Sequence, residues 1–102
     1  MVDLKPRHLT VVKKILQVHI PHKTVWLFGS RATGKTHPAS DIDLAIIDEQ
    51  PLDPKILGDL QYAFEESSLP YRVDLVDWAT AQPNFRAIME QNHEVIQPSV
   101  RK

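Results

Sequence analysis

Hydrophobic residues recur along this sequence with two different periods, and segments of the two kinds alternate. Apolar residues at intervals of three and four are typical of helices with one buried face, and they occur in residues 4–18, 54–66 and 84–92. Short runs of β-branched and aromatic residues are typical of buried strands, and they occur in residues 24–28, 42–47 and 71–77. Asp3 is expected to cap the first helix, and Asp53-Pro54 is expected to begin the second.

This alternation predicts an α/β fold, a small mixed β-sheet of about three strands with helices packed on it. The helix at 54–66 connects two strands, and the order strand, helix, strand indicates a right-handed crossover. Such a crossover would set strand 71–77 parallel to strand 42–47. A short last element is expected around Val95 and Ile96. The apolar residues of the last helix that should face the core are Phe85, Ile88 and Met89.

The segment between the first two strands matches a phosphate-binding P-loop, G-x-x-x-x-G-K-[ST], from Gly29 to Thr36. A P-loop needs a helix that begins at its Lys-Thr pair and leads to a parallel strand. Here Pro38 follows directly, and the next strand begins at about Ile42, which leaves no room for that helix. The sequence context therefore disfavours the P-loop interpretation.

Three aspartates are placed as candidate metal ligands. Asp41 and Asp43 have the same parity at the start of a strand, so both side chains project from one face of the sheet. Asp74 lies within the third strand between two apolar residues, where a carboxylate is costly unless it has a function. Asp77 has the opposite orientation and more plausibly caps the following connection, and each aspartate alone could be an ordinary turn or capping residue.

Taken together, Gly29-Ser30, the Asp41-x-Asp43 pair and Asp74 resemble the signature of the DNA polymerase β-like nucleotidyltransferase superfamily. The run from Phe28 to Leu44 is similar to the minimal nucleotidyltransferases of that superfamily. The resemblance implies that the three aspartates bind the metal ions and that the glycine and serine hold the nucleotide phosphates.

The chemistry of nucleotidyl transfer agrees with these assignments. Two Mg²⁺ ions about 3.5 to 4 Å apart clamp the attacking and leaving oxygens, which takes several carboxylates on rigid strands. Asp74 could complete this site and help activate the acceptor hydroxyl. Arg31 or Lys35 could neutralise the pyrophosphate, and Arg31 is the better candidate because it is nearer Ser30.

The resemblance also implies a partner. A domain of this size has little surface for an acceptor site of its own, and minimal family members resemble the antitoxin halves of modules with HEPN-domain toxins. In those type VII modules the enzyme transfers AMP from ATP to a tyrosine of the toxin. Two alternatives stay open, namely a non-catalytic antitoxin that acts by contact and a nucleotidyltransferase for small molecules such as aminoglycosides.

Composition narrows the remaining possibilities. The 102 residues should form one domain, 1–102, and the formal charge of -1, from 12 basic and 13 acidic residues, gives no general attraction to nucleic acid or membrane. There is no cysteine, no run long enough to span a membrane and no signal peptide. We therefore expect a cytoplasmic protein that binds neither membrane nor nucleic acid directly.

Overall fold

Helices and strands alternate along residues 2–33 and 41–98, the part of the chain that this computed structural model describes. The elements are α1 (Pro6–His19), β1 (Thr24–Phe28), α2 (Ser30–Thr33), β2 (Ile42–Ile47), α3 (Pro54–Glu65), β3 (Val73–Asp77), the 3₁₀ turn η1 (Trp78–Thr80), α4 (Pro83–Gln91) and β4 (His93–Gln97). The predicted helices and strands all occur, and the mixed α/β class is confirmed.

The strands form one mixed sheet in the order β3-β2-β1-β4. β1 pairs with β2 and with β4 in antiparallel orientation, whereas β3 pairs with β2 in parallel orientation, as the connection through α3 requires. The expected count of about three strands was one too low. β4 is an edge strand that buries only Ile96 completely, so its hydrophobic pattern is weak in the sequence.

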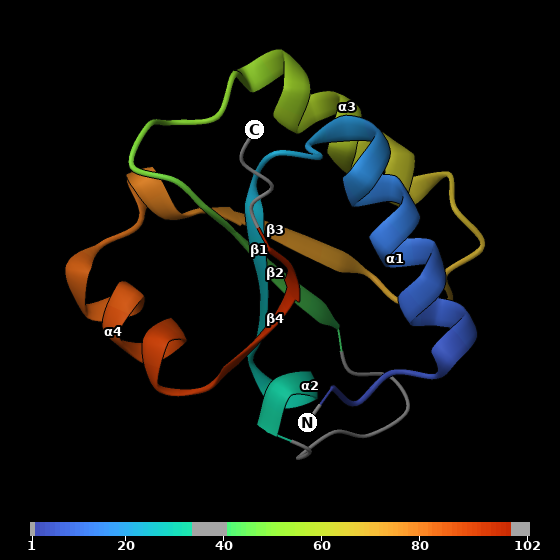
Figure 1. Ribbon diagram of the computed structural model, residues 1–102, viewed down its shortest axis with the longest axis horizontal. Helices are drawn as coiled ribbons and strands as arrows, with labels where there is room; N and C mark the ends of the chain where they lie inside the picture. The colour runs from blue at the N-terminus through green and yellow to red at the C-terminus, as the bar shows by residue number, and fades with distance from the viewer. Residues whose placement is uncertain (1, 34–40, 99–102) are drawn as a thin grey trace.

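Helices cover both faces of this sheet (Figure 1). α1 and α3 lie on one face, and α4 lies on the other. Alternate strand residues, among them Leu27, Ile42 and Leu44, pack in the larger core beneath α1 and α3. The intervening residues, such as Phe28 and Ala45, pack with Met89 of α4 in a smaller core. Because Asp43 alternates with Ile42 and Leu44, its side chain lies on the α4 face.

Two helix details differ from the sequence expectation. Asp3 does not cap α1, because Lys5 occupies the N-cap position and the Asp3 amide instead donates to the Arg31 carbonyl oxygen at 2.8 Å. In α4, Met89 is buried and Phe85 packs on the smaller core, but Ile88 is 60% exposed. Only one face of this short helix reaches the sheet, and residues four apart share that face more closely than residues three apart.

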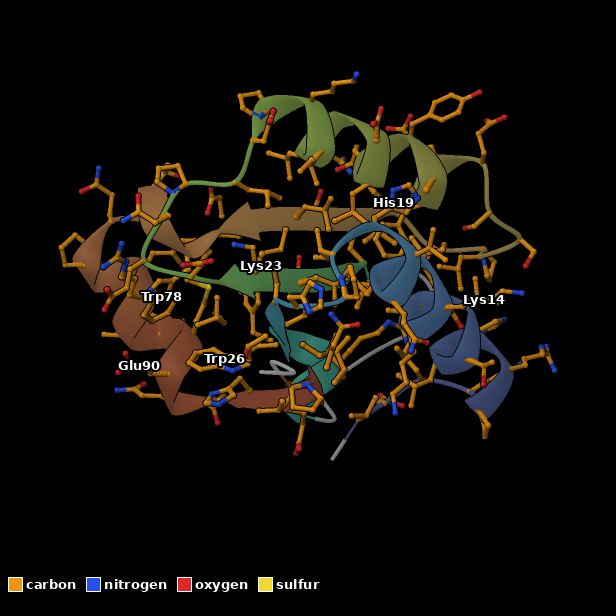
Figure 2. All side chains as sticks on the ribbon, turned by 45° about the horizontal axis from the view of Figure 1, so that its top comes forward. Lys14, His19, Lys23, Trp26, Trp78 and Glu90 are labelled. Carbon is orange, nitrogen blue, oxygen red and sulfur yellow. The ribbon has the colours of Figure 1, made fainter. Side chains whose placement is uncertain are left out.

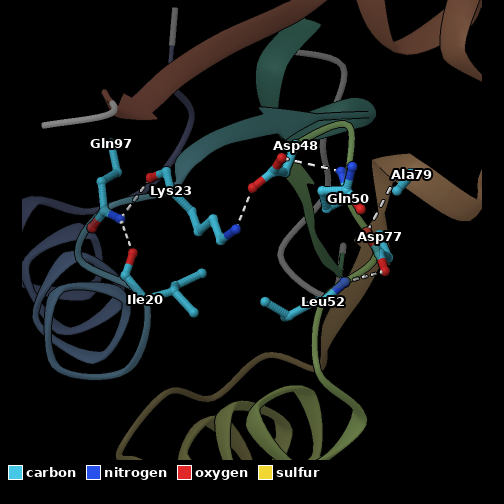
Figure 3. Close-up of polar contacts among 8 residues, drawn as sticks. All are labelled: Ile20, Lys23, Asp48, Gln50, Leu52, Asp77, Ala79 and Gln97. Atoms are coloured by element: carbon cyan, nitrogen blue, oxygen red, sulfur yellow. Dashed lines mark hydrogen bonds and ion pairs between the residues drawn. The ribbon is translucent and has the colours of Figure 1, made fainter. Parts of the chain in front are cut away.

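Polar side chains connect these elements at one end of the strands (Figure 3). Gln97 Nε2 donates to the carbonyl oxygens of Ile20 and Lys23, at 2.8 and 2.9 Å. Lys23 in turn pairs with Asp48. Asp77 accepts from the Leu52 amide at 2.9 Å and from the Ala79 amide at 3.3 Å, which confirms its predicted capping role.

Asp53 caps α3 as expected, accepting a hydrogen bond from the Lys55 amide at 2.8 Å, with Pro54 as the first helical residue. None of the helices in the described part of the chain is long and apolar enough to cross a membrane.

Candidate active site

Two carboxylates lie side by side where β2 and β3 begin. Asp43 and Asp74 are direct partners in the parallel register of the two strands. Asp41 precedes β2 by one residue and shares the parity of Asp43, so the three aspartates project from the same face. The structure therefore brings together the three carboxylates that the sequence singled out, from segments about thirty residues apart in the chain.

Negative charge is concentrated at this point. Burial, followed by the charges of Asp74 and Asp41, raises the pKa of Asp43 from 3.8 to about 6. Arg72 lies beside Asp74, with 3.2 Å between Arg72 Nε and Asp74 Oδ1, but the arginine side chain is 77% exposed and this ion pair is open to solvent. The surroundings of Asp43 therefore favour the arrival of a cation.

Gly29 brings a tight turn directly against Asp43. It is the residue after Phe28, which is the β1 partner of Asp43, and it has a φ of +74°. A Cβ atom added to Gly29 would lie 2.5 Å from Asp43 Oδ2. Only glycine combines this left-handed conformation with so close an approach. Backbone and carboxylate are thus adjacent, as a site for a metal-bound phosphate requires.

The two residues after this glycine begin α2, a single helical turn. Ser30 is its first residue, and the contact of its hydroxyl with a nucleotide phosphate stays a prediction. Arg31 is 5% exposed, and its guanidinium lies against the Tyr71 ring, with 4.1 Å from Cζ to the ring centroid. The structure thus places this guanidinium in the interior, and its predicted contact with pyrophosphate also stays a prediction.

The strand arrangement does not agree with a P-loop. β1 and β2 are antiparallel neighbours, so the parallel crossover that a P-loop requires is absent between them. The helical turn begins at Ser30, directly after Gly29. Lys35, Thr36 and His37 lie outside the described residues. The match to the P-loop pattern is coincidental.

The aspartates fit a magnesium ion that is shared with a nucleotide. Across residues 2–33 and 41–98, no group of three or more histidines or acidic residues has the geometry to hold a metal ion by itself. Mg²⁺ keeps several waters and is usually bound through one or two carboxylates together with substrate phosphates, so a complete protein cage is not needed. Burial and the neighbouring carboxylates raise the pKa of Asp43, and a bound cation would stabilise its ionised form.

Aromatic residues that the sequence left without a role occupy the same face as the aspartates (Figure 2). Trp26 and Trp78 lie on the α4 side of the sheet. Trp26 stacks on His93, with 3.7 Å between ring centroids, and Phe28 contacts Phe85 edge to face. These contacts link β1, β4 and α4 on the face that carries Asp43, whose partner on β1 is Phe28.

Sequence reasoning also passed over Tyr71 and Arg72. Arg72 was recognisable, because it lies two residues before Asp74 and so shares its face of the strand. No sequence signal connected Tyr71 with Arg31, since forty residues separate them in the chain.

A mixed sheet that presents aspartates from two neighbouring parallel strands beside a glycine turn is the arrangement of a nucleotidyltransferase. The family model described as "Polymerase beta, Nucleotidyltransferase" matches residues 11–99, and the chain belongs to this family of enzymes. Within it, the chain is 53% identical over 95 residues to the probable protein adenylyltransferase MntA of Haemophilus influenzae, covering 93% of this chain and 83% of that protein.

Solved structures agree with this relationship. A crystal structure of a toxin–antitoxin with AMP-PNP contains a chain with 28% identity and a TM-score of 0.75, covering 89% of this chain and 73% of that one. A mutant MntA–HpeT toxin–antitoxin complex, in which two aspartates separated by one residue are changed to glutamate, has 26% identity, a TM-score of 0.74 and the same coverage.

Proposed function

We propose that this protein is the antitoxin of a type VII toxin–antitoxin pair and transfers AMP from ATP to a tyrosine hydroxyl of a partner HEPN toxin, with two Mg²⁺ ions. The observation that carries the proposal is the pairing of Asp43 with Asp74 across parallel strands, with Gly29 against the Asp43 carboxylate. Carboxylates beside an approachable backbone suit a metal-bound triphosphate. We expect the protein to act in the cytoplasm.

Each site residue has a defined task in this proposal. Asp41 and Asp43 would hold Mg²⁺ together with the nucleotide, and Gly29 and Ser30 would approach its phosphates. When bound, Mg²⁺ would polarise the α-phosphate and stabilise the leaving pyrophosphate. Asp74, beside Asp43, would complete the ligand set and orient the acceptor hydroxyl, accepting its proton as the new bond to phosphorus forms.

The position of Asp74 supports a protein acceptor. β3 is an edge strand of the sheet, and the Asp74 side chain is 41% exposed. A hydroxyl carried by another chain can therefore reach this carboxylate without a cleft of the enzyme's own. In contrast, a small acceptor such as an aminoglycoside would need a largely enclosed pocket to be held in place.

The similar proteins support the same reading. The Haemophilus influenzae relative has the name of a probable protein adenylyltransferase, and the AMP-PNP in the toxin–antitoxin structure is an analogue of ATP. The two substituted aspartates of the mutant complex have the same spacing as Asp41 and Asp43. Together they favour ATP as the donor and a toxin as the acceptor.

The direct test is the mass of the toxin. A HEPN-domain toxin, incubated with the enzyme, ATP and Mg²⁺, should gain one or more AMP units by intact-protein mass spectrometry. Asp43→Asn should abolish the gain, and EDTA should do the same. Asp59→Asn is the matched control, because Asp59 is an exposed residue of α3, and it should leave the gain unchanged.

The same experiment separates the non-catalytic alternative. An antitoxin that acts by contact would still neutralise the toxin after Asp41→Asn and Asp43→Asn, without any change in toxin mass. That result, or neutralisation by the unaltered protein with no AMP on the toxin, would contradict the proposal.

A further inference from the structure

Behind the Gly29 turn, side chains from three distant segments meet in one cluster. His8 of α1, Arg31 of α2 and Tyr71, two residues before β3, form what we call the Tyr71 brace. The Tyr71 ring contacts both other side chains: the guanidinium lies over its face, and the imidazole meets it in a T-shaped arrangement at a centroid distance of 5.1 Å. The brace connects the turn that carries Gly29 to the strand that carries Asp74.

Arg31 is held in the brace by more than its ring contact. One guanidinium nitrogen, NH1, donates to the Asp3 carbonyl oxygen at 2.9 Å, and the Arg31 carbonyl oxygen accepts from the Asp3 amide at 2.8 Å. With 5% exposure, the guanidinium cannot reach a phosphate in solvent unless these contacts break. An arginine so enclosed is better suited to positioning than to ligand binding.

His8 adds a second ring contact to Tyr71. It is 9% exposed, and its Nδ1 has no hydrogen-bond partner among the described atoms. Burial, with the charges of Arg7, Lys5 and Arg31, lowers the pKa of His8. A neutral imidazole avoids repulsion with the nearby Arg31 guanidinium, so the cluster is electrostatically consistent.

The Gly29 turn needs external support of this kind. α2 has only four residues, and its internal bonding includes a hydrogen bond from the Ala32 amide to the Gly29 carbonyl oxygen at 3.1 Å. A single helical turn is not stable in isolation, because nucleation fixes several residues for few hydrogen bonds. Its position therefore depends on contacts with the rest of the fold, and the Arg31 side chain supplies two of them, to the Tyr71 ring and to the Asp3 carbonyl oxygen.

Building on the proposed function, we propose that Arg31 is a positioning residue, which sets the Gly29–Ser30 backbone opposite Asp43 and Asp74 through its stack on Tyr71, and does not bind the nucleotide itself. Two short stretches of chain join the brace to the site. Gly29 and Arg31 are two residues apart, and Tyr71 and Asp74 are three residues apart. Movement of the ring thus alters the distance between the turn and the carboxylates.

The first measurement uses neither nucleotide nor toxin. Hydrogen exchange of the Ala32 amide reports how often the Gly29 turn opens. Tyr71→Leu removes the ring on which the guanidinium stacks, and Arg31→Lys replaces the planar guanidinium by an ammonium group. Each change should therefore speed this exchange by about tenfold or more. Tyr71→Phe keeps the ring and should stay within about twofold of wild type. Tyr62→Leu, at an exposed tyrosine of α3, is the matched control and should change nothing.

The second measurement is the affinity for AMP-PNP with Mg²⁺ by calorimetry, without toxin. Tyr71→Leu should weaken binding about as much as Arg31→Lys, by about tenfold, and the double variant should be no weaker than either single one. Non-additivity is the mark of two residues that act as one unit. Circular dichroism identifies any variant that does not fold. If one variant does not fold, the affinity of the other is compared with that of the wild type.

Two results would overturn the inference. If Ala32 exchange is the same in wild type and Tyr71→Leu, the ring does not hold the turn. If Arg31→Lys weakens AMP-PNP binding while Tyr71→Leu does not, the guanidinium contacts phosphate directly. Failure of the proposed function appears differently, as an absence of AMP on the toxin while the exchange results stand.

Discussion

At the scale of the single residue, Asp43 is a source of instability in the metal-free protein. Its pKa is raised from 3.8 to about 6 by burial and by Asp74 and Asp41, so the folded chain binds this proton more tightly than the unfolded chain. The contribution of Asp43 to the free energy of unfolding therefore falls as pH rises through the interval between these two values, and it stays lowered above about 6.

Asp43→Asn should consequently stabilise the protein in EDTA near neutral pH, although it removes activity. After allowance for solvent screening, we expect a gain on the order of 1 to 2 kcal/mol. Thermal denaturation of both proteins across the acidic to neutral range checks this, and the gain should vanish below about pH 4. A gain of equal size at every pH would show that the charge of Asp43 is not the cause.

Gly29 allows a second prediction at the same scale. Gly29→Ala combines a left-handed conformation with a Cβ atom 2.5 Å from Asp43 Oδ2, so it should lower the free energy of unfolding by about 1 to 3 kcal/mol. Gly58→Ala is an internal contrast, because Gly58 lies within α3 and nothing is within 4 Å of its added Cβ. That change should stabilise by about 0.5 to 1 kcal/mol.

Urea denaturation of the two alanine variants measures both effects under one set of conditions. Equal behaviour of the variants would contradict the tight approach of Gly29 to Asp43.

At the scale of the element, β4 is joined to the rest of the fold by a side chain as well as by its strand pairing. Gln97 donates to the carbonyl groups of Ile20 and Lys23, which lie in the segment that leads into β1. Gln97→Ala should lower the free energy of unfolding by about 1 to 2 kcal/mol, since two partly buried carbonyls each lose a hydrogen bond, although that of Ile20 still accepts from the Lys23 amide. Gln91→Ala, at an exposed residue ending α4, should cost much less in the same urea titration. An equal loss in both would show that the Gln97 bonds contribute nothing specific.

Elements are also the scale at which the sequence was most informative. Strong periodicity predicted α3 with its Asp53 cap, and the order strand, helix, strand predicted the parallel pairing that puts Asp74 beside Asp43. β4 was expected only as a short element around Val95 and Ile96, because an edge strand buries few residues and its hydrophobic pattern is weak. Ile88 was wrongly placed in the core because the sequence does not show how much of α4 touches the sheet. The burial of Arg31 could not be predicted for the same reason, since its partner Tyr71 is near it only in the fold.

At the scale of the whole molecule, the binding site for Mg²⁺ should be complete only when the nucleotide is bound. Because the described residues hold no ready-made metal cage, Mg²⁺ alone should raise the melting temperature little, whereas Mg²⁺ with AMP-PNP should raise it clearly. Ligand at about 100 times its dissociation constant adds about 2.7 kcal/mol to the free energy of unfolding.

Thermal shift measurements with Mg²⁺ alone, AMP-PNP alone and both together check this. Asp43→Asn should lose the additional shift given by the two together. A full shift with Mg²⁺ alone would instead indicate a metal site that the protein forms by itself.

The parallel pairing of Asp43 with Asp74 has one more consequence, for truncated genes. The most recognisable part of the sequence, from Gly29 to Asp43, ends before α3 begins, and the third carboxylate comes only after that helix. A gene fragment interrupted within α3 would keep the motif from Gly29 to Asp43 but would not encode β3, which carries Asp74. Copies of this kind in genomes would look like enzymes by their motif and be inert, so the segment around Tyr71 to Asp74 is the better marker of an active copy.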